Sequence, residues 1–207
     1  MNKDTKTFLA SIRGASPFIM HNSEGANPLC RWTLEGASIK KKGSKKTEAD
    51  IKKLDEISFM SSLYWSQDLD GLYLPTDNLR KMILEAGRSL DQKGAKKQIS
   101  GIRFNEYLGY KFLTENRSDI SLLKDDLTKR YFKIVTIGRA KVPSVRAIFK
   151  SWQVDFEIMI DTSIINPSSV EEWISYGGDR IGLGCRRPYG PTPGEFGRFI
   201  LEKFKEI

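Results

Sequence analysis

The stretch that decides the fold is Trp152-Gln153-Val154-Asp155-Phe156-Glu157-Ile158-Met159-Ile160-Asp161. Large apolar side chains stand at every second position, and polar side chains stand at most of the positions between them. Because successive side chains of a β-strand point to opposite faces, this period of two predicts a strand with one buried face and one largely polar face. Such a strand is typical of an antiparallel sheet that is covered on one face only.

The residues after this strand predict a helix, a glycine-rich loop and a last strand. Ser168 and Glu171 have the spacing of a capping box, and Pro167 suits the first turn of a helix. Gly177-Gly178 would end that helix, and residues 196–204 would form the last strand of the chain. The chain is therefore expected to close with a unit of strand, helix, loop and strand.

The residues before the central strand predict the remaining sheet and two more helices. Thr47 and Asp50 form a weaker relative of a capping box, from which a helix would run as far as Tyr64. Thr76 would cap another helix, because the apolar residues that follow it have helical spacing. Further strands are predicted at residues 7–14, 72–74, 107–113 and 131–137. We predict one α+β domain over residues 1–207, with a mainly antiparallel sheet and helices on one face.

Residues 23–46 predict a segment of another kind. They hold Gly25, Pro28, Gly36 and Gly43 together with a run of lysines. Glycine and proline interrupt regular elements, and clustered lysines favour solvent. We predict that this segment is a flexible basic insertion within the single domain.

Length and composition bound the class of protein. The chain has 207 residues, 39% of them hydrophobic, which is enough for one folded domain. No run of about 18 uncharged apolar residues occurs, and Lys3 and Asp4 interrupt any apolar leader, so we expect a cytoplasmic protein without contact to a membrane. Cys30, Cys185 and His21 are too few for a Cys/His zinc site or a disulfide framework, and we expect no metal and no cofactor.

The charge of the chain favours a polyanionic partner. There are 34 Lys and Arg residues against 26 Asp and Glu, a formal net charge of +8. Four basic segments contain no acidic residue: 38–46, 93–103, 138–150 and 180–187. They predict loops that meet phosphate groups, although basic loops that only face solvent would have the same composition.

The glycine-rich segment near the C-terminus is the strongest local pattern. It reads Gly182-Leu183-Gly184-Cys185-Arg186-Arg187-Pro188-Tyr189-Gly190 and continues as Gly194-Glu195-Phe196-Gly197-Arg198-Phe199. Glycines permit close backbone approach and positive φ, so exposed amides could contact phosphates. The arginines add charged forks, and the tyrosine adds a stacking surface. The alternative is a loop that only reverses the chain.

Motifs of catalysis are absent from the sequence. There is no phosphate-binding G-x-x-x-x-G-K-[ST], no H-E-x-x-H and no G-x-S-x-G. His21 could act as a general base, because imidazole titrates near neutral pH, but no partner for it is evident. The acidic pairs Asp68/Asp70 and Asp125/Asp126 have the character of turn residues rather than metal ligands. We predict a protein without catalytic activity, in which His21 positions a ligand.

Two parts of the chain carry a family resemblance. The opening Ser11-Ile12-Arg13-Gly14-Ala15-Ser16-Pro17-Phe18-Ile19-Met20-His21-Asn22 is similar to the first strand and turn of the RAMP superfamily of CRISPR-associated proteins. A glycine-rich loop between the last helix and the last strand is a second shared feature. Both ends also resemble small proteins encoded by phages and prophages. Two departures are the longer loop over residues 190–195 and the lack of a counterpart to the acidic residue that cuts target RNA in some members.

The resemblance implies a ferredoxin-like βαββαβ fold and a function. That function is non-catalytic binding of single-stranded nucleic acid, either RNA or single-stranded DNA with RNA favoured, in a bacterial or phage-infected cell, with copies aligned along the strand. The runner-up is a metal-independent endoribonuclease that uses His21, and a third hypothesis is a phage structural or protein-interaction module. The predicted nucleic-acid contacts are His21, Asn22, Lys40, Lys41, Lys42, Lys96, Lys97, Arg139, Lys141, Arg146, Gly182, Gly184, Arg186, Arg187, Tyr189 and Arg198.

Overall fold

A computed structural model describes residues 4–90, 94–114, 123, 126–138 and 140–207. Its main sheet runs antiparallel throughout, and β5 (Ile102–Phe104) pairs with its central strand β9 beside the main path. In order across the sheet, the strands are β10 (Phe199–Glu206), β1 (Thr5–Gly14), β9 (Trp152–Asp161), β6 (Gly109–Thr114), β4 (Gly71–Pro75) and β3 (Trp65–Ser66).

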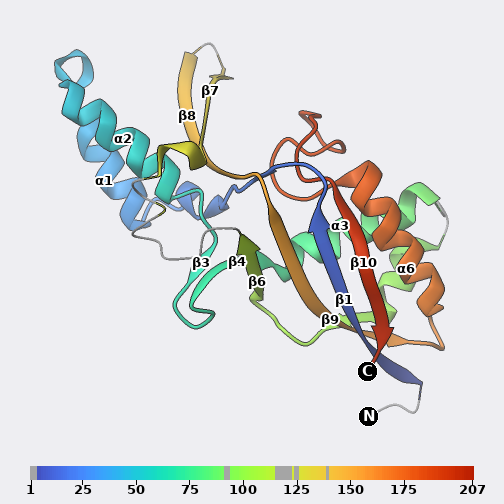
Figure 1. The fold of residues 1–207 in the computed structure, drawn as a ribbon. Coiled ribbons are helices and arrows are strands. Elements are labelled where there is room, and N and C mark those ends of the chain that lie inside the picture. Colours follow the sequence, from blue (N-terminus) through green and yellow to red (C-terminus); the bar gives the residue numbers. More distant parts are fainter. Residues whose placement is uncertain (1–3, 91–93, 115–122, 124–125, 139) are drawn as a thin grey trace.

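Two helices cover one face of this sheet, α3 (Thr76–Leu90) and α6 (Pro167–Tyr176) (Figure 1). Along the chain, β1, α3, β6, β9, α6 and β10 follow one another in a βαββαβ order. Of these four strands, β1 lies between β10 and β9 in the sheet, and β6 lies on the other side of β9. The predicted ferredoxin-like α+β fold with helices on one face is confirmed.

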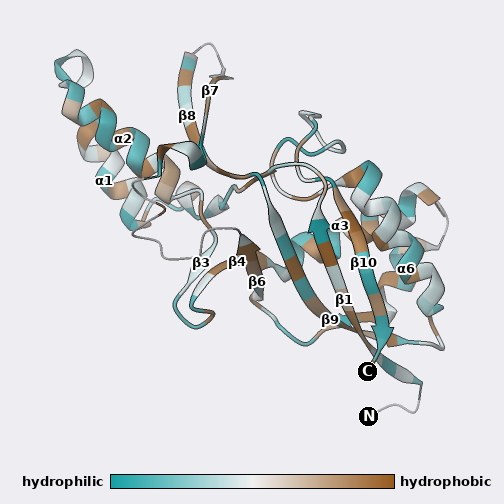
Figure 2. Ribbon diagram, in the orientation of Figure 1, coloured by the Kyte–Doolittle hydropathy of each residue, from teal (hydrophilic) through white to brown (hydrophobic). Residues whose placement is uncertain are grey.

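The core lies between this sheet and its helices. Alternate side chains of β9, from Trp152 to Ile160, are buried, as the period of two predicted, and the hydrophobic bands of Figure 2 follow them. The two helices approach closely because residue 87 is glycine: a Cβ there would stand 2.7 Å from the ring of Trp173. Core side chains from α3 and α6 are Leu79, Met82, Ile83, Ala86, Val170, Trp173 and Ile174.

The other face of the sheet is open and carries paired polar groups. Ser11 Oγ donates to Asp155 Oδ1 at 2.5 Å, and Gln153 donates to both residues. Arg13 pairs with Glu202 across neighbouring strands. The polar groups of this face are thus paired with one another.

Two insertions extend the βαββαβ unit, and both leave the same end of the sheet (Figure 1). The first, between β1 and β4, contains β2 (Phe18–Ile19), η1 (Ser23–Ala26), α1 (Arg31–Lys40), η2 (Gly43–Lys45) and α2 (Glu48–Met60). The second, between β6 and β9, contains η4 (Leu127–Lys129) and the hairpin β7 (Arg130–Ile137) and β8 (Ala140–Phe149).

The insertions are bound to each other. Strands β2, β8 and β7 form a second sheet of three strands. Helix α2 adds side-chain bonds to β8: Ser58 Oγ donates to the carbonyl of Val145 at 2.9 Å, and the amide of Ala147 donates to Ser62 Oγ at 3.0 Å. Hydroxyl groups at the end of a helix thus satisfy backbone groups on the side of β8 that faces α2.

Three sequence-based predictions about local structure were wrong. Residues 23–46 contain helix α1 rather than an irregular excursion, because α1 packs on α2 through Gly36, which is buried beside Ile57. Residues 140–149 form strand β8 instead of a basic arm, because β7 and β2 pair with them. Residues 95–98 form the short helix α4 (Ala95–Gln98), followed by η3 (Ile99–Gly101).

Two boundaries also differ from the prediction. Asn166, not Ser168, caps α6, since its side chain accepts from the amide of Ser168 at 3.1 Å. The last strand begins at Phe199, because the preceding residues belong to the glycine-rich loop that follows η5 (Gly177–Ile181). No helix in the described part of the chain has the length and apolar character needed to cross a membrane.

Candidate nucleic-acid interface

The glycine-rich loop, residues 182–198, lies at the end of the sheet from which both insertions leave (Figure 1). Backbone hydrogen bonds fix the loop to β2 and to the residue before it. The amide of Cys185 donates to the carbonyl of Ile19 in β2 at 2.9 Å, and the amide of Gly197 donates to the carbonyl of Pro17 at 2.8 Å. The two quoted ends of the sequence are therefore in direct contact. Gly182, Gly184 and Gly197 all have positive φ, the conformation predicted for this loop.

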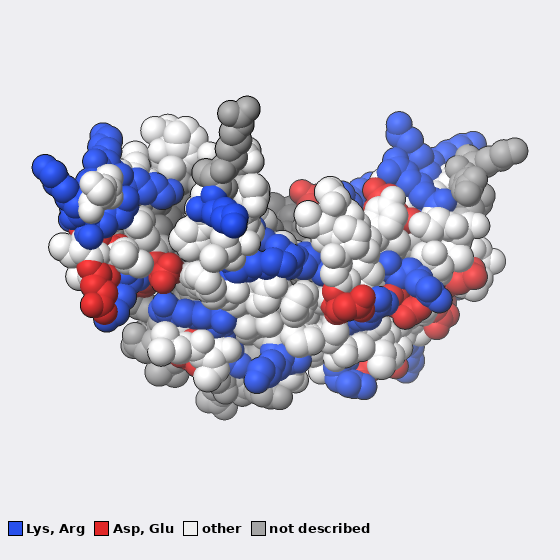
Figure 3. Space-filling view, turned by 90° about the horizontal axis from the view of Figure 1, so that it is seen from above, with Lys and Arg blue, Asp and Glu red and all other residues white. Residues whose placement is uncertain are grey.

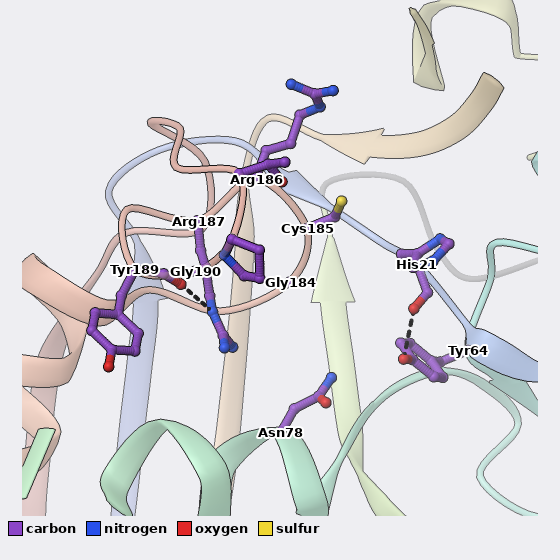
Figure 4. A pocket seen from close by; sticks show the side chains of 11 residues that line it. His21, Tyr64, Asn78, Gly184, Cys185, Arg186, Arg187, Tyr189 and Gly190 are labelled. Carbon is purple, nitrogen blue, oxygen red and sulfur yellow. Dashed lines mark hydrogen bonds between the residues drawn. The ribbon is translucent and has the colours of Figure 1, made fainter. Parts of the chain in front are cut away.

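A pocket of about 250 Å³ opens beneath the loop (Figure 4). Its walls come from the loop, from the segment after β2, from Tyr64 shortly after α2, and from the first turn of α3. Among the described residues that line it, two are arginine, one is histidine and none is Asp or Glu. Such a pocket attracts anions. Its lining is His21, Tyr64, Asn78, Gly184, Cys185, Arg186, Arg187, Tyr189, Gly190, Pro191 and Thr192.

The two arginines of the loop point in different directions (Figure 4). Arg187 extends toward Asn78 across the pocket, and its Nε donates to the carbonyl of Tyr189 at 2.8 Å, which fixes the stem of the side chain. Arg186 has a φ of 56°, and its side chain points away from the pocket floor. Guanidinium groups held in this way have free donors for phosphate oxygens.

His21 stands at the rim of the pocket, opposite the loop (Figure 4). Its side chain is open to solvent on one side, while packed neighbours remove water on the other. This desolvation, together with the positive charge of Arg146, lowers the pKa of His21 from its ordinary value of 6.5. The imidazole is therefore mainly neutral at pH 7.

Tyr64 and Asn78 complete the floor of the pocket, and the sequence did not indicate either of them. The hydroxyl of Tyr64 donates to the carbonyl of His21 at 2.7 Å. Burial raises the pKa of Tyr64, and a hydrogen bond with Asn78 opposes this shift in part. Asn78 is the third residue of α3. The sequence predicted that this helix starts at Thr76, and this was the one local feature that bore on the position of Asn78.

Arg146 brings the hairpin to the same site. It lies on β8, and its Nη1 contacts Sγ of Cys185 in the glycine-rich loop. Cys30 and Cys185 are both free thiols, the first buried and the second half-buried. Within the described ranges, no three His, Cys, Asp or Glu side chains are grouped closely enough to hold a metal ion.

Several predicted contact residues have structural partners instead. Arg198 is held by acidic groups: its Nη2 lies 3.0 Å from Glu195 Oε2, and its Nη1 donates to the carbonyl of Asp179. Asn22 uses both ends of its amide, donating to the carbonyl of Leu63 at 3.0 Å and accepting from the amide of Glu24 at 2.9 Å.

Gly182 also has a structural partner. Its amide donates to Gly177 at 2.7 Å, and a Cβ there would stand 2.7 Å from Pro188. The glycine therefore shapes the loop, and this amide is not free to bind a phosphate.

The predicted lysines lie outside the pocket. Lys40, Lys41 and Lys42 are at the end of α1, where Lys42 pairs with Asp50 at 2.6 Å. Lys141 is exposed near the tip of the hairpin.

Two further lysines and one arginine complete the predicted set. Lys96 and Lys97 are on α4, and neither of them lines the pocket. Arg139 lies outside the described residues.

Viewed toward the end that bears the insertions, the molecule is rich in basic side chains (Figure 3). Lysine and arginine side chains cover the side of α1 and α2, the opposite side and parts of the surface between them. Acidic side chains occur on this face in smaller groups. The basic residues of distant segments thus share one face, which their order in the sequence does not show.

No protein-family model and no curated protein matches the chain. A solved structure does: the chain is similar to one in the "Cryo-EM structure of the Type III-B Cmr-beta bound to cognate target RNA", at 11% sequence identity and a TM-score of 0.53. The alignment covers 99% of this chain and 61% of that chain, so the protein spans about three fifths of the length of its structural neighbour. The chain shares the fold of a chain of that Cmr-beta complex. The likeness supports the ferredoxin-like fold that the resemblance implied.

Proposed function

We propose that this protein binds single-stranded RNA without cleaving it, and that the pocket under the glycine-rich loop holds phosphate groups of the strand. The observation that carries the proposal is the pocket lining, which includes Arg186, Arg187 and His21 and, among the described residues, no acidic side chain. The similar fold in a complex bound to target RNA supports RNA as the ligand. The resemblance to RAMP proteins also favours several copies side by side on one strand.

Replacing Arg186 and Arg187 together by alanine tests this proposal. We expect the dissociation constant for a fluorescein-labelled 30-nucleotide RNA to rise at least about tenfold, since charge-assisted contacts contribute roughly 1 to 3 kcal/mol each. The melting temperature should stay close to wild type, because both side chains are partly solvent-exposed and the one side-chain bond of Arg187 lies within the loop.

The variant Lys96→Ala/Lys97→Ala is the matched control, because it removes the same charge from α4, where neither lysine lines the pocket. Its affinity, measured by fluorescence anisotropy, should remain within about threefold of wild type. Equal losses in the two double variants would contradict a phosphate site at the pocket and leave only diffuse attraction.

One observation favours a second candidate function, RNA cleavage by His21. A neutral imidazole at the rim of an anion-attracting pocket has the protonation state of a general base. Incubation of labelled RNA with wild type and His21→Ala, each with and without EDTA, separates the two functions. Under our proposal both proteins leave the RNA intact; metal-independent cleavage that disappears in the variant would make the nuclease the better assignment.

A further inference from the structure

A second, larger hollow lies between α1, α2 and the β8 strand of the hairpin, away from the glycine-rich loop. Its volume is about 780 Å³. Five residues of α2 line it, namely Ile51, Leu54, Asp55, Ile57 and Ser58, together with Ser61, the C-terminal cap of the helix. Because consecutive residues of a helix rise by 1.5 Å, this wall is about 15 Å long. The hollow is therefore a groove rather than a round pocket.

The walls of the groove are mainly aliphatic. Ile51 and Leu54 of α2 face Val142 and Pro143 of β8, and Trp32 of α1 adds an aromatic side chain. Ile51 is 52% exposed although it belongs to the lining, and Val142 is 37% exposed. Large apolar side chains that stay exposed together in a concave surface mark a place where another molecule is bound.

The charges of the groove are unequal. Lys40 and Lys46 line it, and the described lining holds one carboxylate, Asp55. Lys46 Nζ donates to the carbonyl of Gly43 at 2.7 Å, a neutral partner. The segment from residue 38 to residue 46 contains five lysines and no acid. This end of the groove thus attracts a carboxylate.

The groove differs from the RNA pocket in the features that decide its ligand. An RNA backbone would meet the carboxylate of Asp55 and an aliphatic wall. A base would need a free aromatic plane, and one face of Trp32, the aromatic side chain of the lining, is covered by the guanidinium of Arg31 at 4.1 Å from the ring centroid. An amphipathic helix presents apolar side chains at positions i, i+3, i+4 and i+7 and requires a groove about three turns long. The dimensions and chemistry of the groove match the helix.

We propose that this groove binds an amphipathic helix of a partner protein. The apolar side chains of that helix lie against Ile51, Leu54 and Val142, and its Asp or Glu residues lie next to Lys40 and Lys46. The site is separate from the proposed RNA pocket, and it gives the protein a means of joining a larger assembly while its glycine-rich loop faces RNA.

A display library of 16-residue peptides with leucine fixed at helical spacing and all other positions random is the probe for this site. Peptides selected on the wild-type protein are expected to carry Asp or Glu at one end, and their affinity should fall at least tenfold on Ile51→Glu. Ile200→Glu is the matched control: Ile200 is 50% exposed on the open face of β10, so this variant should bind the peptides as wild type does. Failure to enrich such peptides, or equal binding to Ile51→Glu, would overturn the proposal.

A charge reversal tests the same site without changing its apolar walls. Lys40→Glu/Lys46→Glu should bind the selected peptides at least tenfold more weakly and should prefer versions in which their acidic residues are replaced by lysine. An unchanged preference would refute the assignment. If labelled RNA displaces the peptides, or if Ile51→Glu weakens RNA binding as much as Arg186→Ala/Arg187→Ala does, the groove belongs to the RNA path and the proposal is wrong.

Discussion

His21 shows how one residue could connect pH to ligand binding. Desolvation by its neighbours and the charge of Arg146 lower its pKa, so the free protein holds a mostly neutral imidazole at pH 7. An RNA phosphate near the ring would favour the charged form and raise that pKa again. By linkage, binding of RNA would then be accompanied by uptake of a proton.

We therefore expect RNA affinity to increase as the pH falls from 7.5 to 5.5, by up to about tenfold, because one charge-assisted contact is gained. Fluorescence anisotropy at constant ionic strength measures this change. His21→Ala should show a flat profile over the same range, and a flat profile in wild type would mean that His21 lies away from the RNA.

The same shift acts on stability with a defined sign. The pKa of His21 is lower in the folded state than in the unfolded chain, so the unfolded chain binds the proton more readily. The contribution of His21 to stability is thus present above pH 6.5 and is lost as the pH falls below it.

Individual site residues were predictable only where their role is local. Arg186, Arg187 and His21, which residue type and neighbouring turn residues singled out, line the pocket, and their contact with a nucleic acid stays a prediction. Arg198 and Asn22 have the same residue types but are bound to Glu195, Leu63 and other groups that only the folded chain brings close. Tyr64 and Asn78 come from segments whose sequence gives no reason to place them side by side.

At the scale of elements, the glycine-rich loop depends on its contact with β2. Gly184 has a φ of 76°, and a Cβ at this position would stand 2.7 Å from the carbonyl of Ile19 and 2.9 Å from the ring of Phe18. The same carbonyl accepts the amide of Cys185. A side chain at residue 184 would force the loop away from β2.

Gly184→Val should therefore lower both stability and RNA affinity. Backbone strain of this kind costs about 1 to 3 kcal/mol, and the melting temperature of a chain of this size should fall by roughly 2 to 12 °C. Gly43→Val is the matched control, since Gly43 has a φ of 57° but no atom within 4 Å of a Cβ. If thermal denaturation shows equal losses for both variants, strain in φ explains the effect and contact with β2 does not.

Elements with a strong local pattern were predicted well. The strand Trp152–Asp161 has the predicted bounds, and Thr47 and Asp50 form a complete capping box at the start of α2. Helix α1 was missed because Gly36 interrupts it and because Gly25, Pro28, Gly43 and a run of lysines flank it, and packing on α2 overrides these weak preferences. Strand β8 was missed because Pro143 and two cations, Lys141 and Arg146, conceal its pairing with β7.

At the scale of the whole molecule, both insertions and the glycine-rich loop gather at one end of the βαββαβ unit (Figure 1). The open sheet face carries Asp155 and Glu202 in hydrogen bonds or ion pairs with neighbouring strands, whereas the pocket at the inserted end is lined by two arginines and, among the described residues, by no acidic side chain. The RNA would thus cross the end of the sheet rather than its open face. The basic segments of the sequence meet there only because the insertions fold back together.

This arrangement predicts a strong dependence of RNA binding on salt. If 4 to 6 phosphates are neutralised, release of their counterions should weaken binding of a single strand roughly a hundredfold between about 50 and 200 mM salt. The slope of log affinity against log salt, measured by anisotropy, should become shallower by about 1.4 in Arg186→Ala/Arg187→Ala, because each lost phosphate contact removes roughly 0.7 from the slope. Lys96→Ala/Lys97→Ala should keep the wild-type slope. An affinity that does not change with salt would contradict a phosphate-based interface. A shallower slope in the arginine variant, with the wild-type slope kept in the lysine variant, would assign two of the phosphate contacts to the glycine-rich loop.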